Sequence, residues 1–70
     1  MRMRYELNGK KLTEAEAIEY IENFPRTPFV PFDEQTFDGV RSKAHLMMFV
    51  YGIKSFTSRL NGLTFIKDEA

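Results

Sequence analysis

Hydrophobic and polar residues alternate along the first seven positions of the chain. A repeat of two is the period of a strand with one buried and one exposed face. Asn8 and Gly9 follow, a pair that favours a tight hairpin turn because both residues tolerate positive φ. Residues 10–12 leave room for only a short returning strand. This part of the chain therefore predicts a β-hairpin.

A second Asn-Gly pair, at positions 61 and 62, separates the apolar segments 56–60 and 63–67. This arrangement predicts a second hairpin, closed by a two-residue turn. In that register Leu60 lies opposite Leu63, and Arg59 shares a face of the sheet with Thr64.

Between the hairpins, residues 13–24 have the period of an amphipathic helix. Thr13 and Glu16 form a capping box, in which each side chain accepts a hydrogen bond from the backbone of the other. Pro25 ends the helix because it forces the preceding residue out of the α region. The apolar residues on one face are Ala17, Ile18, Ile21 and Phe24.

Residues 25–32 contain all three prolines of the chain. Proline fixes φ and removes a backbone donor, which predicts an extended connector. We expect a stiff strap whose Phe29 and Phe32 pack into the core. The Pro-x-x-Pro spacing also suits a groove of the SH3 type, although Arg26 is misplaced for such a ligand.

A second helix is predicted from Asp33, an N-cap candidate, with another possible start at Asp38. Gly52 favours its end. Residues 46–53 also suit a strand, because Phe, Val and Tyr favour sheets, but we prefer the helix. The residues expected to face inward are Phe37, Val40, Ala44, Met47, Met48 and Tyr51.

These elements fit one small α+β domain over residues 1–70: β-hairpin, helix, proline-rich strap, helix and β-hairpin. Seventy residues leave room for a single domain. Because no disulfide or evident metal supports so small a core, we expect self-association, with a homodimer as the simplest form.

The chain has no cysteine and one histidine. This excludes disulfides, thiolate metal sites and multi-histidine metal sites within one chain. His45 lies three residues from Ser42, but no motif supplies an orienting carboxylate or an activated serine. We therefore expect no enzyme activity, no cofactor, no metal site and no small-molecule substrate.

The longest apolar run, residues 46–53, is much shorter than a membrane span. The basic residues near position 1 are not followed by the apolar stretch of a signal peptide. We therefore expect no membrane association and a cytoplasmic location.

The formal net charge of zero hides a segregation of charge along the chain. Residues 12–38 carry one basic and seven acidic side chains, whereas the remaining residues carry nine basic and three acidic ones. If both hairpins join one sheet, its open face becomes a basic platform, as in several RNA-binding folds. The candidate nucleic-acid-binding residues are Arg2, Arg4, Lys11, Arg41, Lys43 and Arg59.

The outer side of the second helix carries more apolar surface than a chain this short needs to bury. Such a patch indicates a protein partner or a second copy of the chain. The candidate partner-binding and dimer residues are Leu46, Phe49, Val50 and Ile53.

Two functions follow as expectations. The first is a small non-catalytic binding or regulatory protein, such as an accessory protein or inhibitor of the phage or mobile-element type, that docks on a larger macromolecule. The second is a nucleic-acid-binding protein, for RNA more than DNA, that uses the basic face of the sheet.

Overall fold

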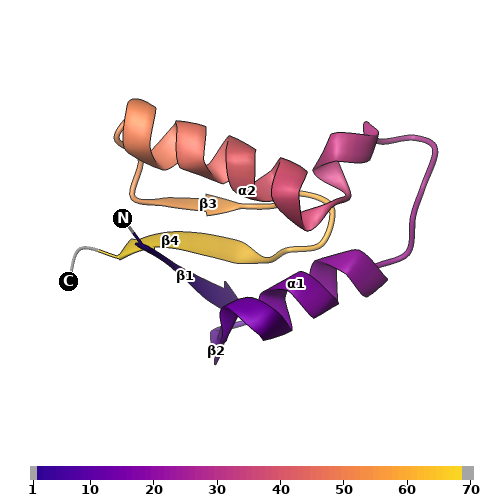
Figure 1. The fold of residues 1–70 in the computed structure, drawn as a ribbon, viewed down its shortest axis with the longest axis horizontal. Coiled ribbons are helices and arrows are strands. Elements are labelled where there is room, and N and C mark those ends of the chain that lie inside the picture. The colour runs from indigo at the N-terminus through magenta and orange to yellow at the C-terminus, as the bar shows by residue number, and fades with distance from the viewer. Residues whose placement is uncertain (1, 69–70) are drawn as a thin grey trace.

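The computed structural model describes residues 2–68, which form a four-stranded antiparallel sheet with two helices packed on one face (Figure 1). The strand order is β2-β1-β4-β3, so both hairpins join one sheet through the pairing of β1 with β4. The predicted α+β architecture is confirmed. The elements are β1 (Arg2–Leu7), β2 (Lys10–Leu12), α1 (Glu14–Asn23), α2 (Phe37–His45), β3 (Ser55–Thr57) and β4 (Thr64–Asp68).

Aromatic packing between the sheet and α2 forms the centre of the core. Tyr5 of β1 and Phe65 of β4 lie opposite one another and pack edge to face, with ring centroids 5.4 Å apart. The ring of Phe37, at the start of α2, lies 6.0 Å from Tyr5 and 6.1 Å from Phe65. The largest fully buried side chains are Phe65, Ile21, Met48 and Leu63.

The first hairpin and the start of α1 form as predicted. Asn8 and Gly9 have φ values of 52° and 82°, the left-handed region that the tight turn requires. The Thr13 N–H donates to Glu16 Oε1 at 2.8 Å, and the Glu16 N–H donates to Thr13 Oγ1 at 3.1 Å. The hydrogen bond from the Thr13 backbone holds the pKa of Glu16 below its usual value.

The second hairpin has a different register from the predicted one. Phe56 pairs with Phe65 and Thr57 with Thr64, so the connecting loop spans residues 58–63. Asn61 is not at positive φ, and its Oδ1 accepts a hydrogen bond from the Leu63 N–H at 3.0 Å. This side-chain turn replaces the two-residue turn. The predicted pairing of Leu60 with Leu63 is therefore wrong.

Arg59 consequently lies in this loop and not beside Thr64 on the sheet. The loop is tied to α1, because the Tyr20 hydroxyl donates to the Asn61 carbonyl oxygen at 2.6 Å.

The helix α2 begins later than Asp33, because Thr36 caps it. The Thr36 Oγ1 accepts a hydrogen bond from the Gly39 N–H at 3.2 Å. Phe32–Glu34 form a separate 3₁₀ turn, η1. The break lets the chain change direction between the proline-rich connector and α2 (Figure 1).

The chain stays helical after α2, so the strand alternative for residues 46–53 is wrong. Leu46–Val50 form one wide π turn, η2, in which the Tyr51 N–H donates to the Leu46 carbonyl five residues earlier, at 3.2 Å. The extra residue rotates the following side chains by about 100° relative to an α-helix. Tyr51, predicted to face inward, is therefore exposed. Gly52, at φ +77°, follows as the predicted stop.

Gly39 provides a test of how tightly α2 packs on η1. A Cβ at this position would overlap the carbonyl oxygen of Asp33. Alanine favours a helix over glycine by about 1 kcal/mol, but the overlap forces η1 and α2 apart. We expect Gly39→Ala to lower the free energy of unfolding by about 1–3 kcal/mol in urea denaturation.

The matched control is Ser42→Ala, an exposed position on the same helix, which should leave the free energy of unfolding within about 0.5 kcal/mol of the wild type. A Gly39→Ala protein as stable as the wild type would contradict the close approach of η1 and α2.

Candidate functional site

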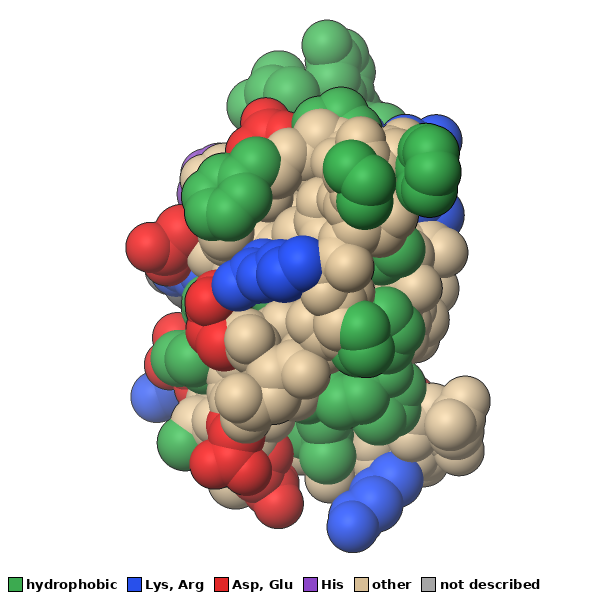
Figure 2. Space-filling model, turned by 90° about the vertical axis from the view of Figure 1, so that its right-hand side faces the viewer, with side chains coloured by type: hydrophobic (Ala, Val, Ile, Leu, Met, Phe, Trp, Pro, Cys, Tyr) green, Lys and Arg blue, Asp and Glu red, His purple; other side chains and the backbone are tan. Residues whose placement is uncertain are grey.

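The connector between α1 and α2 exposes two large aromatic side chains. Phe29 is 92% exposed and Phe32 is 71% exposed, so the prediction that both pack into the core is wrong. Figure 2 looks at the end of the molecule that carries the connector, where hydrophobic side chains project between polar ones and acidic side chains gather along one side.

One buried side chain, Gln35, holds this loop in shape. Gln35 is 5% exposed, and its Oε1 accepts a hydrogen bond from the Thr27 N–H at 2.8 Å. Its Nε2 donates to the carbonyl oxygens of Thr27 and Val30, each at 2.8 Å. Both amide protons are therefore used. The side chain supplies hydrogen bonds that the proline-rich segment does not obtain from a helix or a sheet.

Arg26 and Glu22 connect the loop to both helices. Arg26 donates to the Gln35 carbonyl oxygen and forms an ion pair with Glu22 at 3.1 Å. Its guanidinium carbon lies 5.5 Å from the centroid of the Phe32 ring. The second carboxylate oxygen of Glu22 accepts a hydrogen bond from the Phe37 N–H at 2.7 Å, at the positive end of α2.

The same loop borders an open hollow of about 430 Å³. The Phe29 N–H donates to Thr27 Oγ1 at 3.2 Å, which fixes the backbone that carries the exposed ring. Aromatic residues, including Phe, are enriched in protein–protein interfaces, so an exposed ring beside an open hollow suits a protein partner. The hollow is lined by Arg26, Thr27, Pro28, Val30, Phe32 and Gln35.

The end of α2 forms a second exposed apolar surface, which we call the η2 patch. Phe49 does not belong to it: its side chain packs against the core, 4.7 Å from the His45 ring centroid and 5.4 Å from Lys67 Nζ. The wide turn adds Tyr51 instead. The η2 patch thus consists of three of the four predicted partner residues and one new one: Leu46, Val50, Tyr51 and Ile53.

A groove of about 740 Å³ lies between α2 and β3. Val40, Met47 and Phe56 give it an apolar lining. Two predicted nucleic-acid-binding residues, Lys43 and Arg59, also line it. Arg59 makes a bidentate contact with Glu34, at 2.9 and 3.1 Å, which offsets its charge.

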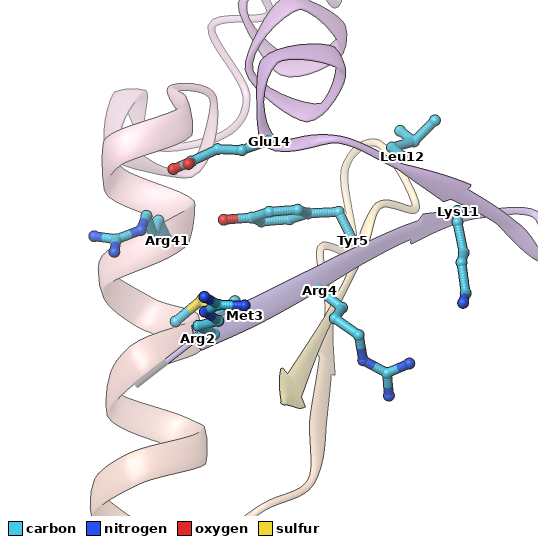
Figure 3. Close-up of a pocket in the computed structure, with 8 residues that line it drawn as sticks. All are labelled: Arg2, Met3, Arg4, Tyr5, Lys11, Leu12, Glu14 and Arg41. Atoms are coloured by element: carbon cyan, nitrogen blue, oxygen red, sulfur yellow. The ribbon is translucent and has the colours of Figure 1, made fainter. Parts of the chain in front are cut away.

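The other four predicted nucleic-acid-binding residues meet at the free edge of β1. They line a pocket of about 410 Å³, which we call the basic notch (Figure 3). Its cationic residues are Arg2, Arg4, Lys11 and Arg41. Within residues 2–68, no ion pair joins any of them to a carboxylate.

Figure 3 shows how the two sides of the notch differ. Arg4 and Lys11 point away from the helices, whereas the Tyr5 hydroxyl points between Glu14 of α1 and Arg41 of α2. Burial raises the pKa of the Tyr5 phenol, and the charge of Glu14 adds to the effect. The hydrogen bond and charge of Arg41 act in the opposite direction.

The open face of the sheet is less basic than predicted. Glu6 lies opposite Lys11, Asp68 lies opposite Arg2, and Arg59 is off the sheet. The aromatic residues of β1, β3 and β4 lie in the core or pack against it. Over the described strands, this face therefore offers no ring on which a base could stack.

Gln35 and Glu22 are the residues that the sequence does not identify. A single glutamine before a helix matches no motif, and Glu22 appears as one of several charges on a solvated helix face. The one signal in the sequence is the density of prolines in residues 25–32. The backbone groups of such a segment need hydrogen-bond partners from elsewhere in the chain.

The role of Gln35 is tested by Gln35→Ala. This change leaves three backbone groups of the connector without their partner, so we expect the free energy of unfolding to fall by about 1–3 kcal/mol. Hydrogen exchange should accelerate most at the Thr27 amide. Exchange that rises equally throughout α2 and the connector would contradict a local bracing role.

Residues 2–68 contain no group of three or more His, Cys, Asp or Glu side chains placed to hold a metal ion. None of the helices in the described part of the chain is long and apolar enough to cross a membrane. No family model, curated protein or solved structure matches the chain.

Proposed function

We propose that the chain is a small, non-catalytic binding protein that docks on a larger protein partner through its connector loop. The observation that carries this proposal is the bracing of the loop by Gln35 while Phe29 stays 92% exposed. Ordering a loop costs conformational entropy. A solvent-exposed ring contributes little packing energy to offset that cost. A loop that is already shaped loses less entropy when a partner binds.

The surroundings of His45 support a non-catalytic role. Its ring packs on Phe49, whereas a general base needs an orienting partner and a nucleophile within hydrogen-bond reach. We accordingly propose that the protein acts by occupying or modulating its partner, as an inhibitor or accessory protein of the phage or mobile-element type does, and that it works in the cytoplasm.

We also propose that the η2 patch binds a second copy of the chain. Val50 is 65% exposed, and its neighbours in the patch add apolar surface that a 70-residue core does not cover. Burial of this surface in a symmetric dimer would supplement a small core.

Nucleic-acid binding is the second candidate function. The observation in its favour is the meeting of four predicted basic residues in the basic notch. Glu14 within the notch, Glu6 and Asp68 on the open face, and the absence of an exposed ring on the described strands weaken it. We rank it below protein docking for these reasons.

Docking through the connector is tested with immobilised wild-type and Phe29→Ser proteins and two lysates of the native host, one treated with nuclease and one untreated. We expect the wild type to capture a protein, and Phe29→Ser to capture at least about ten-fold less, since hot-spot residues carry most of the binding energy. The midpoint of thermal unfolding should not change, because the ring is exposed.

Ile18→Ser is the matched control, since it removes an exposed apolar side chain from α1, outside both the connector and the η2 patch. It should keep the captured protein. If Phe29→Ser captures the same proteins as the wild type, or if every partner disappears with nuclease, docking through the connector is excluded.

Self-association is tested by sedimentation velocity. We expect a wild-type dimer and a Val50→Asp monomer, because a carboxylate in an apolar interface loses its hydration without gaining a partner. Ile18→Asp, at an exposed position on α1, should remain a dimer. A wild-type monomer at the highest soluble concentration would rule out the dimer.

A further inference from the structure

The geometry points to a peptide-binding site in the basic notch, where an extended acidic segment of another protein adds a short strand beside β1 with acidic side chains at alternate positions. The notch is a different surface from the connector loop and the η2 patch. The inference is therefore independent of the function proposed above.

The first half of β1 has a free edge, because β2 ends too early to cover it. Pairing with β2 extends only from Leu7 to Tyr5. In a hairpin closed by a two-residue turn, the pairs Leu7–Lys10 and Tyr5–Leu12 exchange the hydrogen bonds. The next residue that faces the same side is Met3, which lines the notch.

On the other side of β1, strand β4 also makes no hydrogen bond to the backbone N–H and C=O of Met3. Lys67 lies opposite Met3 on β4, but its N–H donates to the Lys54 carbonyl oxygen on the far side, at 3.0 Å. Met3 and Lys67 are therefore a non-hydrogen-bonded pair. The N–H and C=O of Met3 point into the notch, where an added strand would satisfy both.

A free strand edge selects an extended polypeptide as the ligand. An added strand accepts and donates along the same edge, which is the basis of recognition by β-augmentation. A nucleic acid backbone offers acceptors but no matching N–H donors. The edge from Arg2 to Arg4 is about 10 Å long, enough for roughly three extended residues.

The charges of the notch specify the side chains of that segment. Side chains of an added strand alternate between the two faces of the sheet. The residue opposite Met3 faces Tyr5 and the helices, where Glu14 and Arg41 offset one another (Figure 3). The residues before and after it face the open side, beside Arg2 and Arg4. The segment that fits the notch best therefore has an acidic residue on each side of one uncharged residue.

Arg2 and Arg4, the two cations beside the expected acidic positions, form no ion pair within residues 2–68. Elsewhere in the described chain, Arg26 and Arg59 are held by Glu22 and Glu34. Charge-assisted hydrogen bonds to a carboxylate are about twice as strong as neutral ones.

The test is a titration of the isotope-labelled protein with the blocked pentapeptide Thr-Glu-Val-Glu-Thr, followed by the amide signals in NMR. We expect the largest shift at the Met3 amide. An isomer with adjacent acids, Thr-Glu-Glu-Val-Thr, should bind at least about three-fold more weakly, because one carboxylate then faces Glu14. Arg4→Gln should weaken binding of the first peptide by about five-fold or more.

Two controls separate this site from general attraction between charges. Lys43→Gln removes a cation from the groove between α2 and β3, and Phe29→Ser alters only the connector; both should bind the peptide as the wild type does. A single-stranded RNA of equal charge should bind more weakly and leave the Met3 amide unshifted.

Four results would overturn the inference. They are equal binding of the two peptides, equal weakening by Lys43→Gln and Arg4→Gln, tighter binding of the RNA through Arg2 and Arg4, and no binding of the first peptide. In the last case Arg2 and Arg4 would serve only to protect the edge of the sheet from pairing.

Discussion

The hydrogen bonding of Gln35 is the constraint on which the shape of the connector and the exposure of Phe29 depend. The proline-rich connector cannot join the sheet, and its backbone groups still need partners. One buried amide satisfies three of them. Through Arg26 and Glu22 the same network reaches the end of α1 and the first turn of α2. The exposure of Phe29 is therefore a product of specific contacts and not of a loose loop.

Two departures from regular geometry create the other surfaces. The wide turn at Leu46–Val50 rotates the end of the helix and turns Tyr51 outward. The early end of β2 at Leu12 leaves Met3 at a free edge between basic side chains. In both places a short irregularity exposes groups that a regular helix or a longer hairpin would cover. The surfaces proposed for binding thus coincide with the points where regular structure stops.

How far the sequence predicts this structure depends on the range of the interactions involved. Asn8-Gly9 and the Thr13–Glu16 capping box act within three residues, and both form as expected. Asn61-Gly62 has the same local signal, but its turn gives way to the pairing of Phe56 with Phe65, which fills the core. The exposure of Phe29 depends on Gln35, six residues away, and hydrophobicity alone predicts the opposite. Segregation of charge along the chain predicted a basic open face of the sheet, but it could not show that Arg59 lies off the sheet and pairs with Glu34.

The hydrogen bonds of Gln35 imply that the connector is shaped before any partner binds. Backbone ¹⁵N relaxation of the free protein measures this directly at residues 27–30. We expect order parameters of about 0.85, equal to those of α1 and α2, because Gln35 bonds to both ends of this segment. Order parameters below about 0.6 at Thr27 and Phe29 would show a loop without fixed shape and would contradict it.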